Sequence, residues 1–212
     1  MTDCDMLKNS FIILLLIMII AACTEKRKPT GEEEKYIAEV ERYRQEKDRA
    51  FRNNEKSPIP ENERSDFQGL KYFPPDTKYY IAAEFVKYDN PDTLKIFTTK
   101  PDDIRTMLRY GEFRFKLDGK DYALQGYVNV PPEQPLYVFL PFTDLTTDVE
   151  TYGGGRYLDI DLKDDADTVI LDFNMAYNPY CAYNSRYSCP LVPSENFLNV
   201  EIKAGEKKYK EH

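Results

Sequence analysis

An alternation of apolar and charged residues runs through the second half of the chain and is clearest in residues 112–118. There, phenylalanine and leucine positions alternate with Arg114 and Lys116. This period of two is typical of a strand with one buried face. Asp118-Gly119 then predicts a tight hairpin turn, and the same pattern continues after it.

Short β segments recur from residue 70 onward. They are predicted at residues 78–88, 93–98, 112–118, 122–128, 136–142, 158–162, 168–173 and 198–203. Strands do not alternate with helices, which argues against a parallel doubly wound sheet. The predicted fold is therefore mainly β: an antiparallel sandwich or open barrel of about eight strands, α+β only at the margin.

One amphipathic helix is predicted ahead of the strands, from residue 32 to about residue 54. Thr30 and Glu33 have the spacing of a capping box, so the helix should begin near Gly31. Its less polar stripe consists of Tyr36, Ile37, Val40, Tyr43, Arg44, Ala50 and Phe51. The other positions mix Glu with Lys, which favours a helix packed outside the sheet over a more basic, membrane-surface helix.

The N-terminus carries an apolar run over residues 11–22. A membrane-spanning helix needs about 20 apolar residues, so this run better fits the core of a secretion signal. It ends in Ile20-Ala21-Ala22-Cys23, which resembles the lipobox of bacterial lipoproteins. That resemblance implies cleavage before Cys23 and attachment of lipid to its thiol. The alternative is a hydrophobic anchor that happens to end in a cysteine.

These features predict the organisation of the whole chain. Its parts are a lipoprotein signal peptide (1–22), a charged tether (23–31), one globular domain (32–207) and a C-terminal tail (208–212). The expected location is the cell envelope, with lipid on Cys23 as the link to a bacterial membrane, on its periplasmic or outer-surface side. Starting translation at Met6 instead of Met1 would give the signal a normal basic beginning.

Composition removes several classes of function. The 212 residues are 42% hydrophobic, enough for a real core. Lys and Arg total 29 against 37 Asp and Glu, and this acidic balance argues against nucleic-acid binding. The one histidine is His212, at the chain end, which disfavours catalytic triads and histidine-ligated metals. No metal and no cofactor are expected.

Polar residues gather in the C-terminal third, beside strand ends and turns. Six of them are candidate ligands for a small polar or anionic molecule: Arg156, Asp172, Asn174, Asn178, Glu195 and Asn196. Three glycines at 153–155 could help Arg156 to cradle an anion. Alternatively, the glycines make a tight turn, Arg156 pairs with an internal carboxylate, and the other residues tie loops together. Nearby tyrosines fit a ligand wall or a core: Tyr152, Tyr157, Tyr177, Tyr180, Tyr183 and Tyr187.

Two cysteines remain for the folded part, Cys181 and Cys189. In an oxidising compartment we expect them to form a disulfide, which would contribute roughly 2.5 kcal/mol. Free thiols are one alternative. A metal site that also uses Asp172 or Glu195 is another, although two thiolates supply only half of the ligands that zinc needs.

Three C-terminal stretches carry a family resemblance: YGGGRYLDIDL, LDFNMAYNPYCAYNSRYSCPLVPSEN and AGEK. Together they resemble the signature of bacterial domain-of-unknown-function family 1684. The likeness runs from about Tyr36 to Lys207. It implies a secreted or envelope protein of undefined activity and assigns no catalytic residue.

Two functions from different classes follow. The first is a membrane-anchored binding or structural lipoprotein with a small-ligand site. The second is an envelope hydrolase that uses paired carboxylates, Asp172 with Glu195 or Asp159, because glycosidases need two carboxyl groups about 5 to 9.5 Å apart. With 37 acidic residues in the chain, chance pairs are expected, and we favour the first function.

Overall fold

The computed structural model describes residues 29–132, 136–163 and 166–210, and those from Glu33 onward form one compact unit. The predicted signal peptide, Cys23 and most of the predicted tether lie outside the described residues. The expected class is confirmed: a mostly β domain with eight strands in a nearly closed, barrel-like sheet and one N-terminal helix. No helix in the described part of the chain has the length and apolar character needed to cross a bilayer.

The strands follow one another with short connections. Their bounds are β1 Tyr80–Lys87, β2 Thr93–Phe97, β3 Ile104–Leu117, β4 Lys120–Asn129, β5 Tyr137–Asp144, β6 Arg156–Asp161, β7 Thr168–Asp172 and β8 Phe197–Leu198. The sheet order is β6-β5-β4-β3-β1-β7, with β2 added to β3 and β8 to β5. All of these pairs are antiparallel except β5 with β8. The predicted turn at Asp118-Gly119 joins β3 to β4, and both residues adopt positive φ.

The alternating residues of the sequence become the core. On β3, Phe113, Phe115 and Leu117 are buried, and they join apolar residues of the other strands in one cluster. At the closing edge of the sheet, Leu158 of β6 and Leu171 of β7 belong to the same cluster. Burial of this alternating face is the main stabilising contribution, because apolar area removed from water gives about 25 cal/mol per Å².

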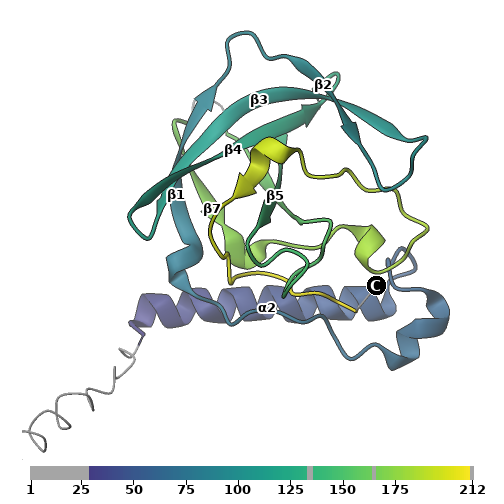
Figure 1. The fold of residues 1–212 in the computed structure, drawn as a ribbon. Coiled ribbons are helices and arrows are strands. Elements are labelled where there is room, and N and C mark those ends of the chain that lie inside the picture. The colour runs from purple at the N-terminus through teal and green to yellow at the C-terminus, as the bar shows by residue number, and fades with distance from the viewer. Residues whose placement is uncertain (1–28, 133–135, 164–165, 211–212) are drawn as a thin grey trace, which may run out of the picture. The chain divides into compact units, whose positions relative to one another are not determined.

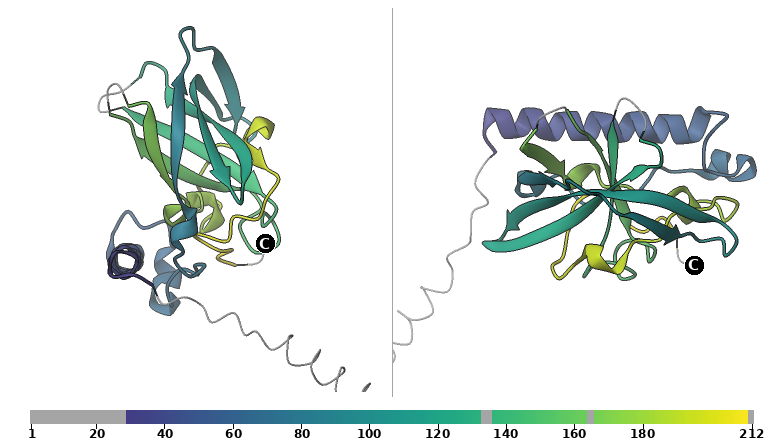
Figure 2. Two further views of the ribbon diagram at one scale, coloured as in Figure 1. Left: turned by 90° about the vertical axis from the view of Figure 1, so that its left-hand side faces the viewer. Right: turned by 90° about the horizontal axis from the view of Figure 1, so that it is seen from above.

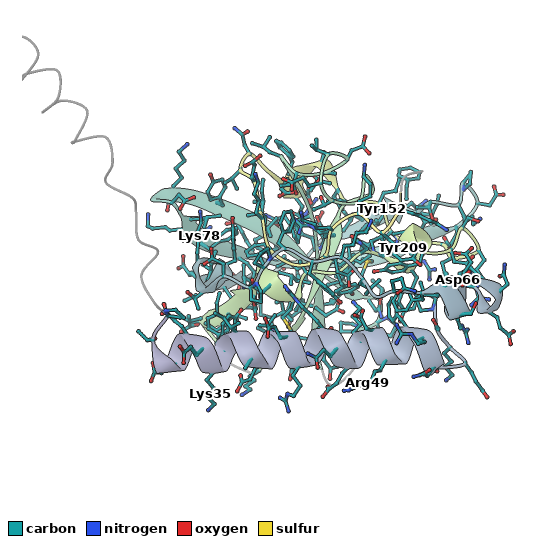
Figure 3. All side chains as sticks on the ribbon, turned by 90° about the horizontal axis from the view of Figure 1, so that it is seen from below. Lys35, Arg49, Asp66, Lys78, Tyr152 and Tyr209 are labelled. Atoms are coloured by element: carbon teal, nitrogen blue, oxygen red, sulfur yellow. The ribbon has the colours of Figure 1, made fainter. Side chains whose placement is uncertain are left out.

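Helix α2 (Gly31–Asn53) runs crosswise at one end of the strands (Figures 1 and 2). It begins where the capping spacing predicts. Val40, Arg44 and Phe51 are its buried residues. Lys35 and Arg49 point away from the sheet (Figure 3). The helix therefore packs outside the sheet through the predicted stripe.

The last predicted strand is much shorter than expected, because of residues 198–203 only Leu198 belongs to a strand, the two-residue β8. Buried side chains bind the backbone after it. The Asp144 carboxylate accepts a hydrogen bond from the Ile202 N–H at 2.6 Å. The Arg156 guanidinium donates to the Ile202 carbonyl at 2.9 Å and to the Ala204 carbonyl. Asp144 and Arg156 pair with each other at 3.3 Å. Together they satisfy backbone N–H and carbonyl groups that the sheet leaves without a partner strand.

The segment expected to form a tail also contacts the domain as far as it is described. The ring of Tyr209 lies 6.3 Å from the ring of Phe67 and 5.3 Å from that of Tyr183. The Lys208 N–H donates to the Glu150 carbonyl at 3.0 Å. Residues 208–210 are thus packed on the domain surface.

Replacing Arg156 with methionine should lower the free energy of unfolding by about 3 to 5 kcal/mol, because Asp144 would be left buried and unpaired. Urea unfolding followed by circular dichroism measures the change. Lys116→Met is the matched control, since Lys116 and Asp121 form an exposed pair that should contribute little. A loss for Arg156→Met as small as that for the control would contradict the structural role of the buried pair.

Candidate functional site

Arg156 was the leading candidate for anion binding, and the structure places it inside the protein. Gly155 adopts a φ of +83°, and a Cβ there would lie 2.7 Å from the Phe142 carbonyl, so glycine is needed for this turn into β6. The Arg156 side chain is 1% exposed, and its terminal nitrogens bind Asp144 and two backbone carbonyls. Burial lowers its pKa and the Asp144 charge opposes that shift. The guanidinium has no surface left to offer an anion.

Asp172 and Asn174 lie together where β7 ends, and they bind helix α2. The Tyr36 hydroxyl donates to Asp172 at 2.7 Å and accepts from the Asn174 amide at 2.8 Å. Asp172 also caps the short turn after β7 by accepting from the Asn174 N–H. The Arg44 guanidinium donates to the Asn174 and Phe73 carbonyls. Burial, and then Asp172, raises the pKa of Tyr36, so this hydroxyl stays protonated.

Asn178 belongs to a different network, around a buried carboxylate. Its N–H donates to Glu206 at 2.9 Å, and its amide donates to the Lys207 carbonyl at 2.8 Å. Glu206 is 1% exposed, pairs with Lys47 at 2.7 Å and accepts from the Tyr183 hydroxyl. These contacts join α2, the 178–183 segment and the C-terminal segment.

Glu195 lies near the surface, bound to the sheet. Arg109 holds its two carboxylate oxygens at 2.9 and 3.0 Å, and the Tyr127 hydroxyl donates to it at 2.6 Å. Arg109 also pairs with Asp92 at 2.7 Å. A carboxylate held by a bidentate arginine is fixed in its orientation, which suits a structural tie better than a general acid.

Asn196 is fully buried between two strands that separate. β4 and β5 pair only at Tyr127 and Phe139. The Asn196 amide group exchanges hydrogen bonds with the Gln125 backbone at 2.8 and 2.9 Å and donates to the Pro141 carbonyl at 2.7 Å. It therefore replaces a missing stretch of the backbone ladder.

The six candidates thus fall into separate networks, and only Asp172 with Asn174 share partners. The carboxylates named for hydrolysis are separated in the same way. Asp172 binds Tyr36 and Asn174, Glu195 binds Arg109 and Tyr127, and Asp159 binds Tyr177. None of these hydrogen bonds joins two of the three carboxylates.

An aromatic cleft lies between α2, the sheet edge and the loop that follows Tyr177. Its volume is about 650 Å³, the size of a small-molecule site. Tyr43 and Phe51 line it from the helix, and Phe139 and Tyr157 line it from β5 and β6. Three more rings come from the loop: Tyr177, Tyr180 and Tyr187. We use the name aromatic cleft for this cavity.

Asp159 supplies the fixed polar group of the aromatic cleft. It is exposed on β6 and accepts a hydrogen bond from the Tyr177 hydroxyl at 2.6 Å. Burial, with Asp159 next, raises the pKa of Tyr177, so the hydroxyl remains a donor. The Lys47 ammonium lies 5.0 Å from the Tyr177 ring centroid, but its charge is matched by Glu206. The carboxylate of Asp159 is therefore oriented by Tyr177 and open to the cavity.

In place of the expected disulfide, Cys181 and Cys189 are buried free thiols. The Cys189 side chain reaches the aromatic cleft, whereas Cys181 lines a neighbouring cavity of about 480 Å³. The two sulfur atoms are in hydrogen-bond contact. No group of three or more His, Cys, Asp or Glu side chains is arranged to hold a metal ion within residues 29–132, 136–163 and 166–210.

The comparison with protein families agrees with the C-terminal signature. Residues 65–207 match the family model described as "Protein of unknown function (DUF1684)". The chain belongs to the DUF1684 family. This match covers β1 to β8, every candidate polar residue and most of the rings of the aromatic cleft.

A solved structure resembles the DUF1684 chain over most of its length. It is the solution NMR structure of an uncharacterised protein from Haloarcula marismortui, 36% identical, with a TM-score of 0.66. The likeness covers 85% of this chain and 98% of that one. No curated protein matches the chain.

Sequence reasoning found part of the aromatic cleft of this DUF1684 protein and missed its scaffold. Four of the tyrosines expected as a ligand wall line it: Tyr157, Tyr177, Tyr180 and Tyr187. Tyr43, Phe51 and Phe139 join them only through the fold. The carboxylates of Asp144 and Glu206 were not among the candidate residues, although Asp144 follows a strand expected at residues 136–142 and Glu206 belongs to the AGEK stretch.

Tyr36→Phe removes only the hydroxyl that joins Asp172 and Asn174 to α2. We expect the free energy of unfolding to fall by about 1 to 2 kcal/mol, because two partners lose a hydrogen bond. Tyr137→Phe is the control, since Tyr137 is 57% exposed on β5. Chemical unfolding of both variants decides the point, and an unchanged stability for Tyr36→Phe would mean that these residues do not hold the helix.

Proposed function

We propose that the protein is a lipid-tethered binding domain of the cell envelope whose aromatic cleft takes a small polar molecule. The observation that carries the proposal is a cavity of about 650 Å³ with many aromatic rings and one oriented carboxylate, Asp159. Binding sites commonly combine apolar walls with a few fixed polar groups. The lipobox-like end of the apolar run, at Cys23, supports the tether.

The chemistry of the aromatic cleft favours a ligand with one apolar face and several donors. Aromatic faces carry partial negative charge and attract C–H edges and cations. An ionised carboxylate only accepts hydrogen bonds, so Asp159 selects hydroxyl or ammonium groups. A neutral sugar or an amino sugar has both properties.

An anionic ligand is disfavoured by the charges around the aromatic cleft. Asp159 and Glu46 line it, and the Lys47 charge is paired with Glu206. Arg156, the residue expected to bind an anion, is paired with Asp144 inside the domain. We therefore keep the expectation of a small polar ligand and abandon that of an anionic ligand.

A thermal-shift screen of the full chain in mild detergent tests the ligand. Neutral sugars and amino sugars are one set of probes, and inorganic phosphate, sulfate and sugar phosphates are the other. A ligand at 100 times its Kd stabilises by about 2.7 kcal/mol, which raises Tm by several degrees. We expect such a shift from a member of the first set.

Matched variants test whether the ligand that causes the thermal shift binds in the aromatic cleft. Asp159→Asn and Tyr180→Ala should abolish the shift, because they remove the carboxylate and an exposed wall of the aromatic cleft. Asp161→Asn and Tyr137→Ala should retain it, because these exposed residues lie on β6 and β5 but do not line the cavity. A shift from anions alone, or equal loss in all four variants, would overturn the proposal.

The tether has a separate test in bacterial cells supplied with radiolabelled palmitate. The native chain should incorporate label and fractionate with membranes, and Cys23→Ser should do neither. Cys4→Ser controls for a second cysteine in the N-terminal segment. Palmitate label that persists in Cys23→Ser would contradict lipid attachment at Cys23.

A further inference from the structure

Cys181 and Cys189 are held against each other by the fold. The Cys181 N–H donates to the Cys189 sulfur at 3.1 Å, and the Cys189 thiol is hydrogen-bonded to the Cys181 sulfur. Thr99 fixes the backbone of Cys189 from the other side: its N–H donates to the Cys189 carbonyl at 2.9 Å, and its hydroxyl accepts from the Cys189 N–H at 3.1 Å. The sulfur atoms thus meet without a bond between them.

The two thiols have opposite electrostatic environments. Hydrogen bonds from Cys189 and then from Tyr152, whose hydroxyl lies 3.6 Å from the sulfur, lower the pKa of Cys181 to about 7 against the opposing effect of burial. The same thiol contact, followed by burial, raises the pKa of Cys189. A thiolate is the nucleophile in thiol chemistry, and the geometry favours Cys181 as the attacking sulfur, because the Tyr152 hydroxyl lies beside its sulfur and Cys181 lines a cavity of its own.

A reagent can approach Cys181 through its own cavity. Cys181 is 7% exposed and lines the cavity of about 480 Å³ together with Tyr152, Lys100 and Lys210. Lys100 and Lys210 line this cavity together with Glu63, which pairs with Lys210 at 3.5 Å, and Lys100 can attract reagents that carry carboxylates. Neither residue of the thiol pair is needed by the proposed ligand site, although Cys189 borders it.

We propose that Cys181 and Cys189 form a thiol–disulfide exchange site for small-molecule disulfides. The Cys181 thiolate attacks one sulfur of the substrate, a mixed disulfide forms, and the first substrate thiolate leaves and takes up a proton. Cys189 then loses its proton, attacks the Cys181 sulfur and expels the second substrate thiol. One substrate disulfide is thereby reduced to two thiols, and the protein dithiol is oxidised to a disulfide that closes residues 181–189.

The experiment uses the full chain with Cys4→Ser and Cys23→Ser as the background, so that only the two thiols of the domain remain. Oxidised glutathione is the probe, at about neutral pH, and intact-mass spectrometry follows the products. The background protein should lose both thiols without keeping an adduct, and dithiothreitol should restore them. Adding Cys189→Ser should trap one glutathione on Cys181.

Adding Cys181→Ser instead should slow the reaction by about tenfold, since burial still disfavours the Cys189 thiolate and the Tyr152 hydroxyl contacts Cys181 rather than Cys189. In the Cys189→Ala background, Tyr152→Phe should shift the pH midpoint of Cys181 alkylation upward, which a merely structural tyrosine would not do. Thermal unfolding establishes that each variant is folded. Equal rates in the two single-cysteine variants would overturn the proposal. So would thiols that stay unreactive in the folded protein, or a native disulfide that dithiothreitol does not reduce.

Discussion

The buried pair of Arg156 and Asp144 is the interaction on which the rest of the domain depends. Burying two charges costs several kcal/mol per ion, so such a pair persists only when further hydrogen bonds satisfy it. Here those bonds come from the backbone at Ile202 and Ala204. Two residues after Ala204, Glu206 pairs with Lys47 and accepts hydrogen bonds from Asn178 and Tyr183. These contacts position the helix and the loop that border the aromatic cleft. The buried ion pair therefore helps to position elements that line a cavity open to solvent.

This arrangement explains why the most polar part of the sequence contributes little to the candidate site. Asn196 substitutes for missing ladder bonds between β4 and β5, and Asn174 joins the sheet to α2. What remains open to ligands is the side of the loop that carries aromatic rings, with Asp159 at its edge. Cys181 and Cys189 belong to the same loop. Cys189 lines the aromatic cleft, and Cys181 lines the neighbouring cavity.

The fold was predictable because its signals are local. Alternation of Phe113, Phe115 and Leu117, the Asp118-Gly119 turn and the stripe on the helix each depend on neighbouring residues. The role of Asp159 was not predictable, since it depends on tertiary contacts. For Arg156, pairing with an internal carboxylate was one of the two predicted alternatives and is the one found, but the sequence did not name Asp144 as the partner. The strand expected at 198–203 shows the difference: its alternation is real, but side chains from β5 and β6 satisfy its backbone in place of a neighbouring strand.

Amide hydrogen exchange of the full chain, read at the Ile202 N–H, tests the central claim most directly. Ile202 lies outside the strands of the described residues, and its buried amide donates its hydrogen bond to the Asp144 carboxylate. If the buried ion pair holds the C-terminal segment, this amide exchanges as slowly as those of Phe113 and Leu124 in the central strands, through global unfolding alone. Exchange as fast as that of exposed turns would contradict the claim.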